Sequence, residues 1–259
     1  MLTPRFILMP NKQEFKRILA ISINGHLTQL STTEKEYVRT KGDNIIDLLI
    51  ELKEKHMLEN LTATKIAEIR QKADELVLNF DHIKKLYQIL HKLIALNGAG
   101  NQTEIKIKDT LENEYKLNMN QIVTIFAWTY CSLCELIKQY FTFILNNSIG
   151  NPTGIGMLKD KLQERQVTNL SFFEDIDNRV RNSFFHFDFK FEGTKIYCKN
   201  KSEIYHEYSW RTNEDNQQSE YILLSDLFKL IINADRSSYV MLNALEYLIS
   251  KAQADNNQN

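Results

Sequence analysis

Residues that interrupt helices are scarce in this chain. Only 8 glycines and 3 prolines occur among its 259 residues, whereas an average chain carries roughly 12% of the two together. Because these residues supply most tight turns and end most helices, long helices are expected. Hydrophobic residues make up 43% of the chain, which is enough to form a packed core and excludes a mainly disordered protein. The length fits one large domain or two small ones.

Apolar residues recur at helical spacing along most of the sequence. The stretch 120–145 is apolar almost all round, which is typical of the central helix of a bundle. A heptad seam runs from Ile66 to Ile94; it fits a dimerisation helix or a helix of an intramolecular bundle, and the second reading is preferred. The other expected helices cover residues 12–24, 43–56, 157–166 and 225–251.

Capping and breaking residues indicate where these helices begin and end. Asn or Ser followed three residues later by Glu is a capping pattern, and it occurs at Asn11–Glu14, Ser31–Glu34 and Ser171–Glu174. The third pair is expected to start a helix that ends at Phe185 or His186. Gly42 is expected to interrupt a helix, Ser225 to cap the last one, and the glycine-containing segment 97–101 to divide the chain.

The pattern changes after residue 186. Phenylalanines at 187, 189 and 191 alternate with Asp188 and Lys190, which predicts a strand, and Glu192-Gly193 predicts a hairpin turn. Strands are also expected at 194–199, 204–210 and 3–9, and a polar loop at 211–219. The predicted fold is therefore mainly α: a helical bundle with a small antiparallel β-hairpin, preceded by an α-helical N-terminal region. The predicted division is 1–100 and 101–259.

Charge and cysteine content narrow the function classes. The net charge of −1 gives no overall attraction to nucleic acid, so any such binding needs a local patch. Cys131 and Cys134 lie in an apolar helix without the further ligands of a zinc site, so buried thiols are expected and no metal or cofactor.

Polar residues within 117–134 favour a core helix over a membrane span. A secretory leader is not evident, and a cytoplasmic location is expected.

One short run could carry chemistry: the eight residues from Arg179 to His186. Asn182 and His186 are four apart and neighbour each other on a helix, Arg179 shares almost the same face, and Arg181 lies about 140° around. Histidine can exchange a proton near neutral pH, and arginine offers a fork of donors for phosphate oxygens. No metal is needed for such a site. The structural alternative is a histidine that favours a helix C-terminus through the helix dipole.

The same residues, Arg181-Asn182-Ser183-Phe184-Phe185-His186, form an R-N-x-x-x-H pattern. This pattern resembles the signature of the HEPN superfamily (higher eukaryotes and prokaryotes nucleotide-binding domains). In that family the motif ends a bundle helix, an apolar helix with a polar residue such as Glu135 precedes it, a short hairpin often follows it, and a further helix closes the bundle. The resemblance covers roughly residues 118–252 and implies a HEPN-like helical bundle. It does not extend to residues 1–117, which fit either a substrate-recognition or sensor module or a further part of the bundle.

The resemblance implies a metal-independent endoribonuclease that acts on RNA as a homodimer, with two motifs in one cleft. His186 would be the general acid/base, Arg181 would stabilise the transition state, and Asn182 would orient them. Arg179, Glu135 and Asp188 are supporting residues; Asp188 stands where some toxin members carry a tyrosine that a partner antitoxin modifies. Related proteins act in toxin–antitoxin and antiviral or abortive-infection systems. The alternative is a non-catalytic module that binds a nucleotide, RNA or a partner protein.

Overall fold

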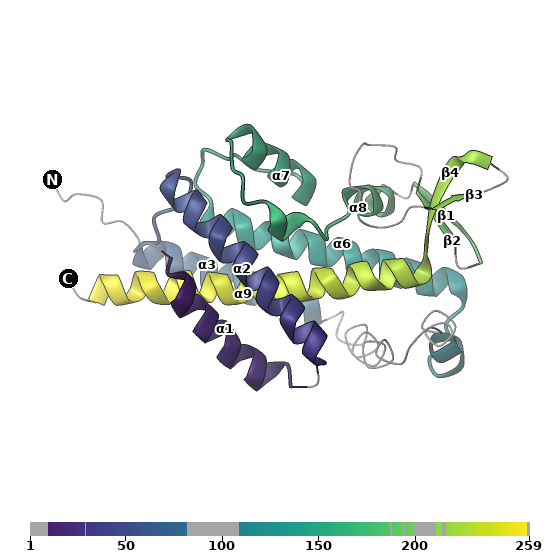
Figure 1. Ribbon diagram of the computed structural model, residues 1–259, viewed down its shortest axis with the longest axis horizontal. Coiled ribbons are helices and arrows are strands. Elements are labelled where there is room, and N and C mark those ends of the chain that lie inside the picture. Colours follow the sequence, from purple (N-terminus) through teal and green to yellow (C-terminus); the bar gives the residue numbers. More distant parts are fainter. Residues whose placement is uncertain are drawn as a thin grey trace. The chain divides into compact units, whose positions relative to one another are not determined.

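The computed structural model describes residues 10–28, 30–81, 109–186, 188–193, 195–198, 211–213 and 216–257. Most of them are helical, and one small antiparallel sheet follows the motif (Figure 1). The predicted fold class, mainly α with a small antiparallel hairpin, is confirmed. The expected strands at 3–9 and 204–210, the seam beyond residue 81 and the division at 97–101 lie outside the described residues.

Helices supply most of the described elements. They are α1 (Lys12–His26), α2 (Thr32–Glu54), α3 (Ala63–Asp81), α6 (Met119–Ile144), α7 (Ile155–Glu164), α8 (Asn178–Phe185) and α9 (Leu224–Asn257), with a 3-10 turn at Ser171–Phe173. The strands are β1 (Phe189–Glu192), β2 (Lys195–Cys198), β3 (Arg211–Asn213) and β4 (Asn216–Leu223). None of the described helices combines the length and apolar character that crossing a membrane requires.

The chain forms two compact units, each built from separate stretches of sequence. The first contains Met1–Asn79, Glu135–Phe173 and Arg236–Asn259, and the second contains Phe80–Cys134 and Glu174–Asp235. Helices α6 and α9 each contribute to both units. The predicted domains, 1–100 and 101–259, are instead two consecutive segments of the chain, and this division stays a prediction.

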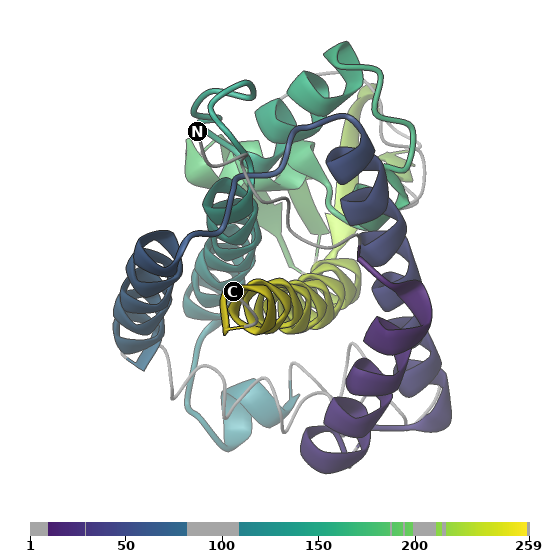
Figure 2. The same cartoon turned by 90° about the vertical axis from the view of Figure 1, so that its left-hand side faces the viewer.

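Helices α1 and α2 of the first unit lie side by side (Figure 2). Their predicted caps are confirmed: the Asn11 side chain accepts a hydrogen bond from the Glu14 N–H, and Ser31 and Glu34 form a complete capping box. The expected interruption at Gly42 is wrong, because α2 continues through it. A Cβ atom at Gly42 would overlap Leu19 Cδ2, so the glycine allows α1 to pack closely rather than ending a helix.

The second unit contains a four-stranded antiparallel sheet with the order β1-β2-β4-β3. Glu192 pairs with Lys195, and Gly193 between them has a φ of +61°, so the predicted hairpin is present. The predicted loop at 211–219 is wrong, because β3 and β4 pair there. This stretch is polar and lacks the alternating apolar residues that identify a strand in a sequence. The buried part of β4 follows this stretch: Ile222 pairs with Ile196 of β2, and both are fully buried.

Two predicted helix starts are also wrong. Ser171–Phe173 is a 3-10 turn and not the beginning of a long helix. Phe172 and Phe173 are buried against Phe141, with ring centroids 5.7 and 5.1 Å from it, and this packing overrides the capping pattern. In α9, Ser225 is already helical, and Asp226 accepts the hydrogen bond from the Leu223 N–H instead (3.0 Å).

Candidate functional site

The motif lies on α8, whose beginning is fixed by Asp177. The Asp177 carboxylate accepts hydrogen bonds from the backbone N–H groups of Arg179 (2.8 Å) and Val180 (3.1 Å), which is the geometry of an N-cap. Burial raises the pKa of the Asp177 carboxyl, against the opposite effect of these hydrogen bonds and of the Arg179 charge. The sequence analysis missed this cap, although aspartate is among the preferred N-cap residues.

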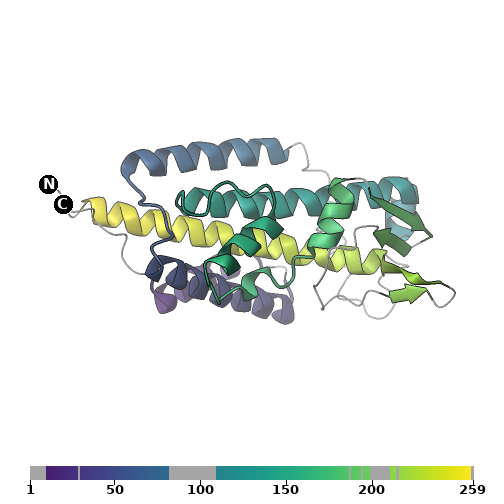
Figure 3. The same cartoon turned by 90° about the horizontal axis from the view of Figure 1, so that it is seen from above.

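Helix α6 anchors α8 at two points. The fully buried Tyr130 hydroxyl accepts a hydrogen bond from the Asp177 N–H (2.8 Å) and donates one to the Asp177 carbonyl (3.3 Å). One residue later, the Cys131 thiol donates to the Arg181 carbonyl (3.5 Å). Figure 3 shows α8 crossing α6 steeply beside the sheet, and Figure 1 shows α8 end-on. No sequence signal distinguished Tyr130 from the other aromatic residues of α6.

Arg181 and Asn182 contact each other directly. The Arg181 Nη1 donates a hydrogen bond to Asn182 Oδ1 (2.9 Å). The guanidinium carbon lies 4.5 Å from the centroid of the Phe185 ring, which is a cation–π contact. Only 8% of Arg181 is exposed, so the aromatic ring and the amide hold its charged group in one place.

His186 follows the last residue of α8 and is exposed. Its backbone N–H donates to the Asn182 carbonyl (3.0 Å), and its ring lies edge-on to Phe185 with centroids 5.4 Å apart. The predicted end of the motif helix, at Phe185 or His186, is therefore confirmed. Phe185 is the common neighbour of Arg181 and His186, a role that the motif pattern did not assign to it.

The three supporting residues occupy different surroundings. Arg179 is half-buried, and its charge acts on the Asp177 carboxyl. Asp188 is exposed, and its backbone N–H donates to the Ser183 carbonyl (2.7 Å). Glu135 belongs to the first compact unit, where it forms an ion pair with Lys138 and accepts a hydrogen bond from Gln139 (2.8 Å). The structure therefore gives Glu135 local partners on its own helix.

The cysteines are free thiols rather than disulfides. Cys131 and Cys134 are buried, as predicted, and burial raises the pKa of both, that of Cys131 to about 11. A thiol with a raised pKa is a poor nucleophile at neutral pH. Within the described ranges, no three His, Cys, Asp or Glu side chains gather closely enough to hold a metal ion.

An apolar groove of about 210 Å³ opens beside the motif. Its lining includes the buried Phe184 and the half-buried Phe189, which pack edge to face with centroids 4.9 Å apart. Trp128 of α6 and Phe185 of α8 also line it, and they are 57% and 56% exposed. The remaining lining residues are Thr124, Ala127 and Cys131. The groove therefore combines a packed apolar base with two accessible aromatic rings.

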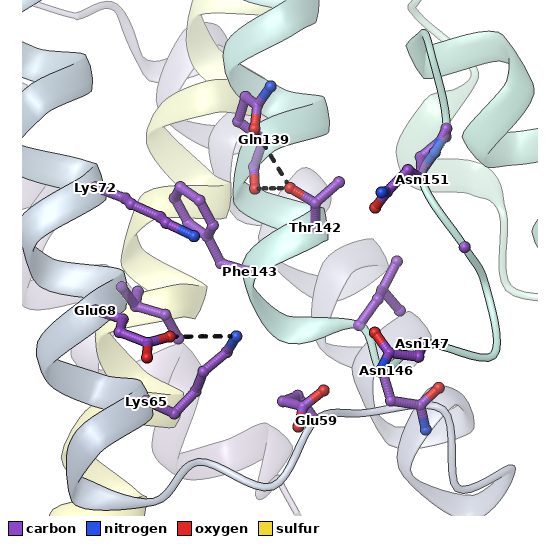
Figure 4. A pocket seen from close by; sticks show the side chains of 14 residues that line it. Glu59, Lys65, Glu68, Lys72, Gln139, Thr142, Phe143, Asn146, Asn147 and Asn151 are labelled. Carbon is purple, nitrogen blue, oxygen red and sulfur yellow. Dashed lines mark hydrogen bonds and ion pairs between the residues drawn. The ribbon is translucent and has the colours of Figure 1, made fainter.

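A larger and more polar cavity, of about 350 Å³, lies in the first unit (Figure 4). Lys65 and Lys72 extend toward it from α3, with Lys65 paired to Glu68 (3.7 Å). From α6, Thr142 donates a hydrogen bond to the Gln139 carbonyl (2.8 Å). None of the motif residues lines this cavity. Its lysines and glutamates balance in charge, so it does not favour an anion or a cation.

Comparison with known proteins adds no functional assignment. The chain matches no protein-family model, no curated protein and no solved structure. The arrangement of side chains on and around α8 is therefore the basis for a proposal.

Proposed function

We propose that this chain is a metal-independent endoribonuclease of the HEPN type. The observation that carries the proposal is the grouping of Arg181 and His186 around one ring, Phe185, with Asn182 bonded to Arg181. This grouping places a cationic fork and an exposed imidazole at the same end of one helix. Such a pair can bind a phosphodiester and exchange a proton with it.

The proposed reaction is attack of a ribose 2′-oxygen on the adjacent phosphorus. His186 removes the 2′-OH proton, the 2′-oxygen bonds to phosphorus, and the bond to the 5′-oxygen of the next nucleotide breaks. Arg181 stabilises the negative charge that develops on the phosphoryl oxygens, and Asn182 holds the guanidinium in place. The leaving oxygen takes a proton from the His186 of a second copy, so that the active form is a homodimer. Its products are a 2′,3′-cyclic phosphate and a free 5′-hydroxyl.

The resemblance to HEPN proteins also suggests the biological setting. We propose that the enzyme serves as a toxin or as an effector of antiviral or abortive-infection defence. In either setting a partner protein would restrain it until it is needed. Asp188 replaces the tyrosine that some antitoxins modify, so a partner here would act by binding rather than by modification at that position.

A second function is favoured by one observation, the burial of Arg181. Only 8% of the residue is exposed, and its guanidinium is engaged by Asn182 and Phe185. An arginine with these partners can serve to hold the end of α8 together. In that case the chain is a non-catalytic module that binds a nucleotide, RNA or a partner protein. A test of cleavage separates this possibility from the enzyme.

The test is cleavage of single-stranded RNA by the purified chain in EDTA. We expect cyclic phosphate ends, and no cleavage of DNA or of RNA with 2′-O-methyl groups. His186→Ala should lower the rate by about 10²–10⁴-fold, the usual contribution of a general acid or base. Because His186 is exposed, its removal should leave the fold intact. The matched control is His26→Ala, which changes an exposed histidine at the end of α1.

The arginines require a separate comparison. Arg181→Lys keeps the charge but loses the planar fork, and it should reduce cleavage strongly. Arg179→Ala should have a much smaller effect. If Arg179→Ala alone abolishes cleavage, Arg179 is the phosphate ligand. If the parent chain binds RNA but leaves it uncut, the non-catalytic module replaces the enzyme.

A further inference from the structure

We propose that the groove between Trp128 and Phe185 binds an unpaired base of single-stranded RNA. The proposal rests on the proposed function for the class of ligand, because it assigns a base-binding subsite to the same site. It gives the groove a role that the motif residues do not have. The motif would contact the phosphate, whereas the groove would hold the base next to it.

The distribution of exposed apolar residues supports a binding role for the groove. Large hydrophobic side chains that are strongly exposed are few among the described residues: Ile21, Trp128, Met157 and Phe185. The two aromatic ones line the same groove, although they come from different helices, α6 and α8. Single exposed apolar residues are common on protein surfaces, but a cluster of them marks an interaction site.

The size of the groove indicates the kind of occupant. About 210 Å³ is smaller than the roughly 300–1,000 Å³ of sites for drug-sized ligands. A stable protein partner buries roughly 800 Å² of surface on each side. Seven residues that line a groove of this volume provide far less surface than that. One flat ring system is the better fit. Aromatic side chains stack on bases of any identity, because every base has a π-face.

The charge beside the groove fits a nucleotide. Phe185 lines the groove, and the guanidinium carbon of Arg181 lies 4.5 Å from the centroid of its ring. A base seated against Phe185 therefore lies next to a cation that can attract its phosphate. The His186 ring meets the same phenylalanine at its edge. One side chain thus links the apolar groove to both charged groups of the motif.

The test compares the binding of two RNAs by two forms of the protein, using RNA that cannot be cut. A short single-stranded 2′-O-methyl RNA and an abasic version of it are titrated against the parent and Trp128→Ala. Stacking on an aromatic residue contributes about 1–3 kcal/mol per base, so the Kd for the base-bearing strand should rise by about 5- to 150-fold. The Kd for the abasic strand should be unchanged, because it has no base to stack. Trp128→Phe should fall between the parent and Trp128→Ala.

Controls address the specificity of the Trp128 effect and the identity of the occupant. Met157→Ala removes an exposed apolar residue of the first unit and should leave the Kd for either strand unchanged. In a Trp210→Phe background, RNA should quench the fluorescence of Trp128. Equal effects of Trp128→Ala on both strands, or no RNA binding by the parent, would overturn the base site. If Trp128→Ala instead splits a dimer in light scattering and leaves RNA affinity intact, the groove is a protein interface.

The base site and the nuclease can fail independently. Trp128-dependent binding by a parent chain that does not cleave RNA supports the base site and overturns the nuclease. Cleavage by a parent chain whose RNA affinity is indifferent to Trp128 supports the nuclease and overturns the base site.

Discussion

Arg181 is part of the packing of α8 as well as a candidate phosphate ligand. It is 8% exposed, donates to Asn182 and stacks on Phe185. Truncating such a side chain removes packing as well as charge. Loss of activity in Arg181→Ala would therefore be ambiguous without a measurement of stability. Arg181→Lys keeps the charge and much of the aliphatic stem, which makes it the more informative substitution.

Gly42 shows that one missing Cβ can set the distance between two helices. Gly42→Ala should lower the free energy of unfolding by about 1–3 kcal/mol, the usual cost of overpacking a core. The new methyl would overlap Leu19 Cδ2, and Leu19 is itself 2% exposed. Urea unfolding measures the change. Gly25→Ala is the control, because nothing lies within 4 Å of a Cβ there, and it should be neutral or slightly stabilising. Equal effects at the two positions would refute this account of the close approach.

The Glu51 carboxylate should make the free energy of unfolding depend on pH in the acidic range. Burial acts against its ionised form, but hydrogen bonds from Asn169 and Thr168 prevail and hold its pKa below the ordinary 4.5. A lowered folded-state pKa contributes stability that is present above the unfolded-state pKa and lost as pH falls through the folded-state pKa. Urea unfolding between neutral pH and pH values below 4.5 should show this loss.

The variant Glu51→Gln should reduce stability at neutral pH and flatten the acid-dependent part of the curve. Glu36→Gln is the matched control, because the Glu36 side chain is 67% exposed and pairs only with the exposed Arg39 among the contacts described for it. If the free energy of unfolding falls with acid pH equally in Glu51→Gln and in the parent, the role assigned to Glu51 is contradicted.

At the scale of elements, α8 is short and depends on contacts from outside itself. It has eight residues, and an isolated helix of this length is not stable in water. Asp177 supplies its cap, and Tyr130 of α6 holds the backbone of Asp177 through two hydrogen bonds. The position of the candidate catalytic groups is therefore set by a residue on another helix.

Tyr130→Phe should test this dependence. It removes the hydroxyl that satisfies the Asp177 N–H and carbonyl, and unsatisfied buried polar groups cost about 1–3 kcal/mol. We expect a loss of this size in urea unfolding, and a loss of RNA cleavage that exceeds what the unfolded fraction explains. Tyr140→Phe, on the same helix and also buried, is the control. A Tyr130→Phe variant as active and as stable as the parent would contradict the anchoring role.

For the whole molecule, the central prediction is a two-fold homodimer with the two His186 residues facing each other. Light scattering at micromolar concentration should give twice the 30.4 kDa mass of the chain. The variant His186→Cys should form a disulfide-linked dimer under mild oxidation, because a two-fold axis brings the same position of both copies together. Glu192→Cys, at the exposed end of β1, should not. A purely monomeric chain would remove the second histidine from the proposed mechanism.

The amino-acid sequence by itself determined the features that depend on local periodicity and local chemistry. Low glycine and proline content and the apolar spacing indicated α1, α6 and α9. The change to alternating phenylalanines indicated β1 and its hairpin, and the motif helix ended where predicted. These features follow from the 3.6- and 2-residue periods of side-chain direction, which any stretch of chain carries by itself.

Only the tertiary structure decided the features that depend on distant partners. Ser171 has a capping pattern, but the packing of Phe172 and Phe173 on Phe141 replaces the helix with a turn. The residues 211–219 are polar, but β3 and β4 pair with each other, and the end of β4, residues 221–223, pairs with β2. The site depends in the same way on Tyr130 and on the rings of Trp128 and Phe185. Local sequence specifies which groups are present, whereas contacts between distant segments decide which of them meet, because their free energy exceeds the weak preferences of single residues.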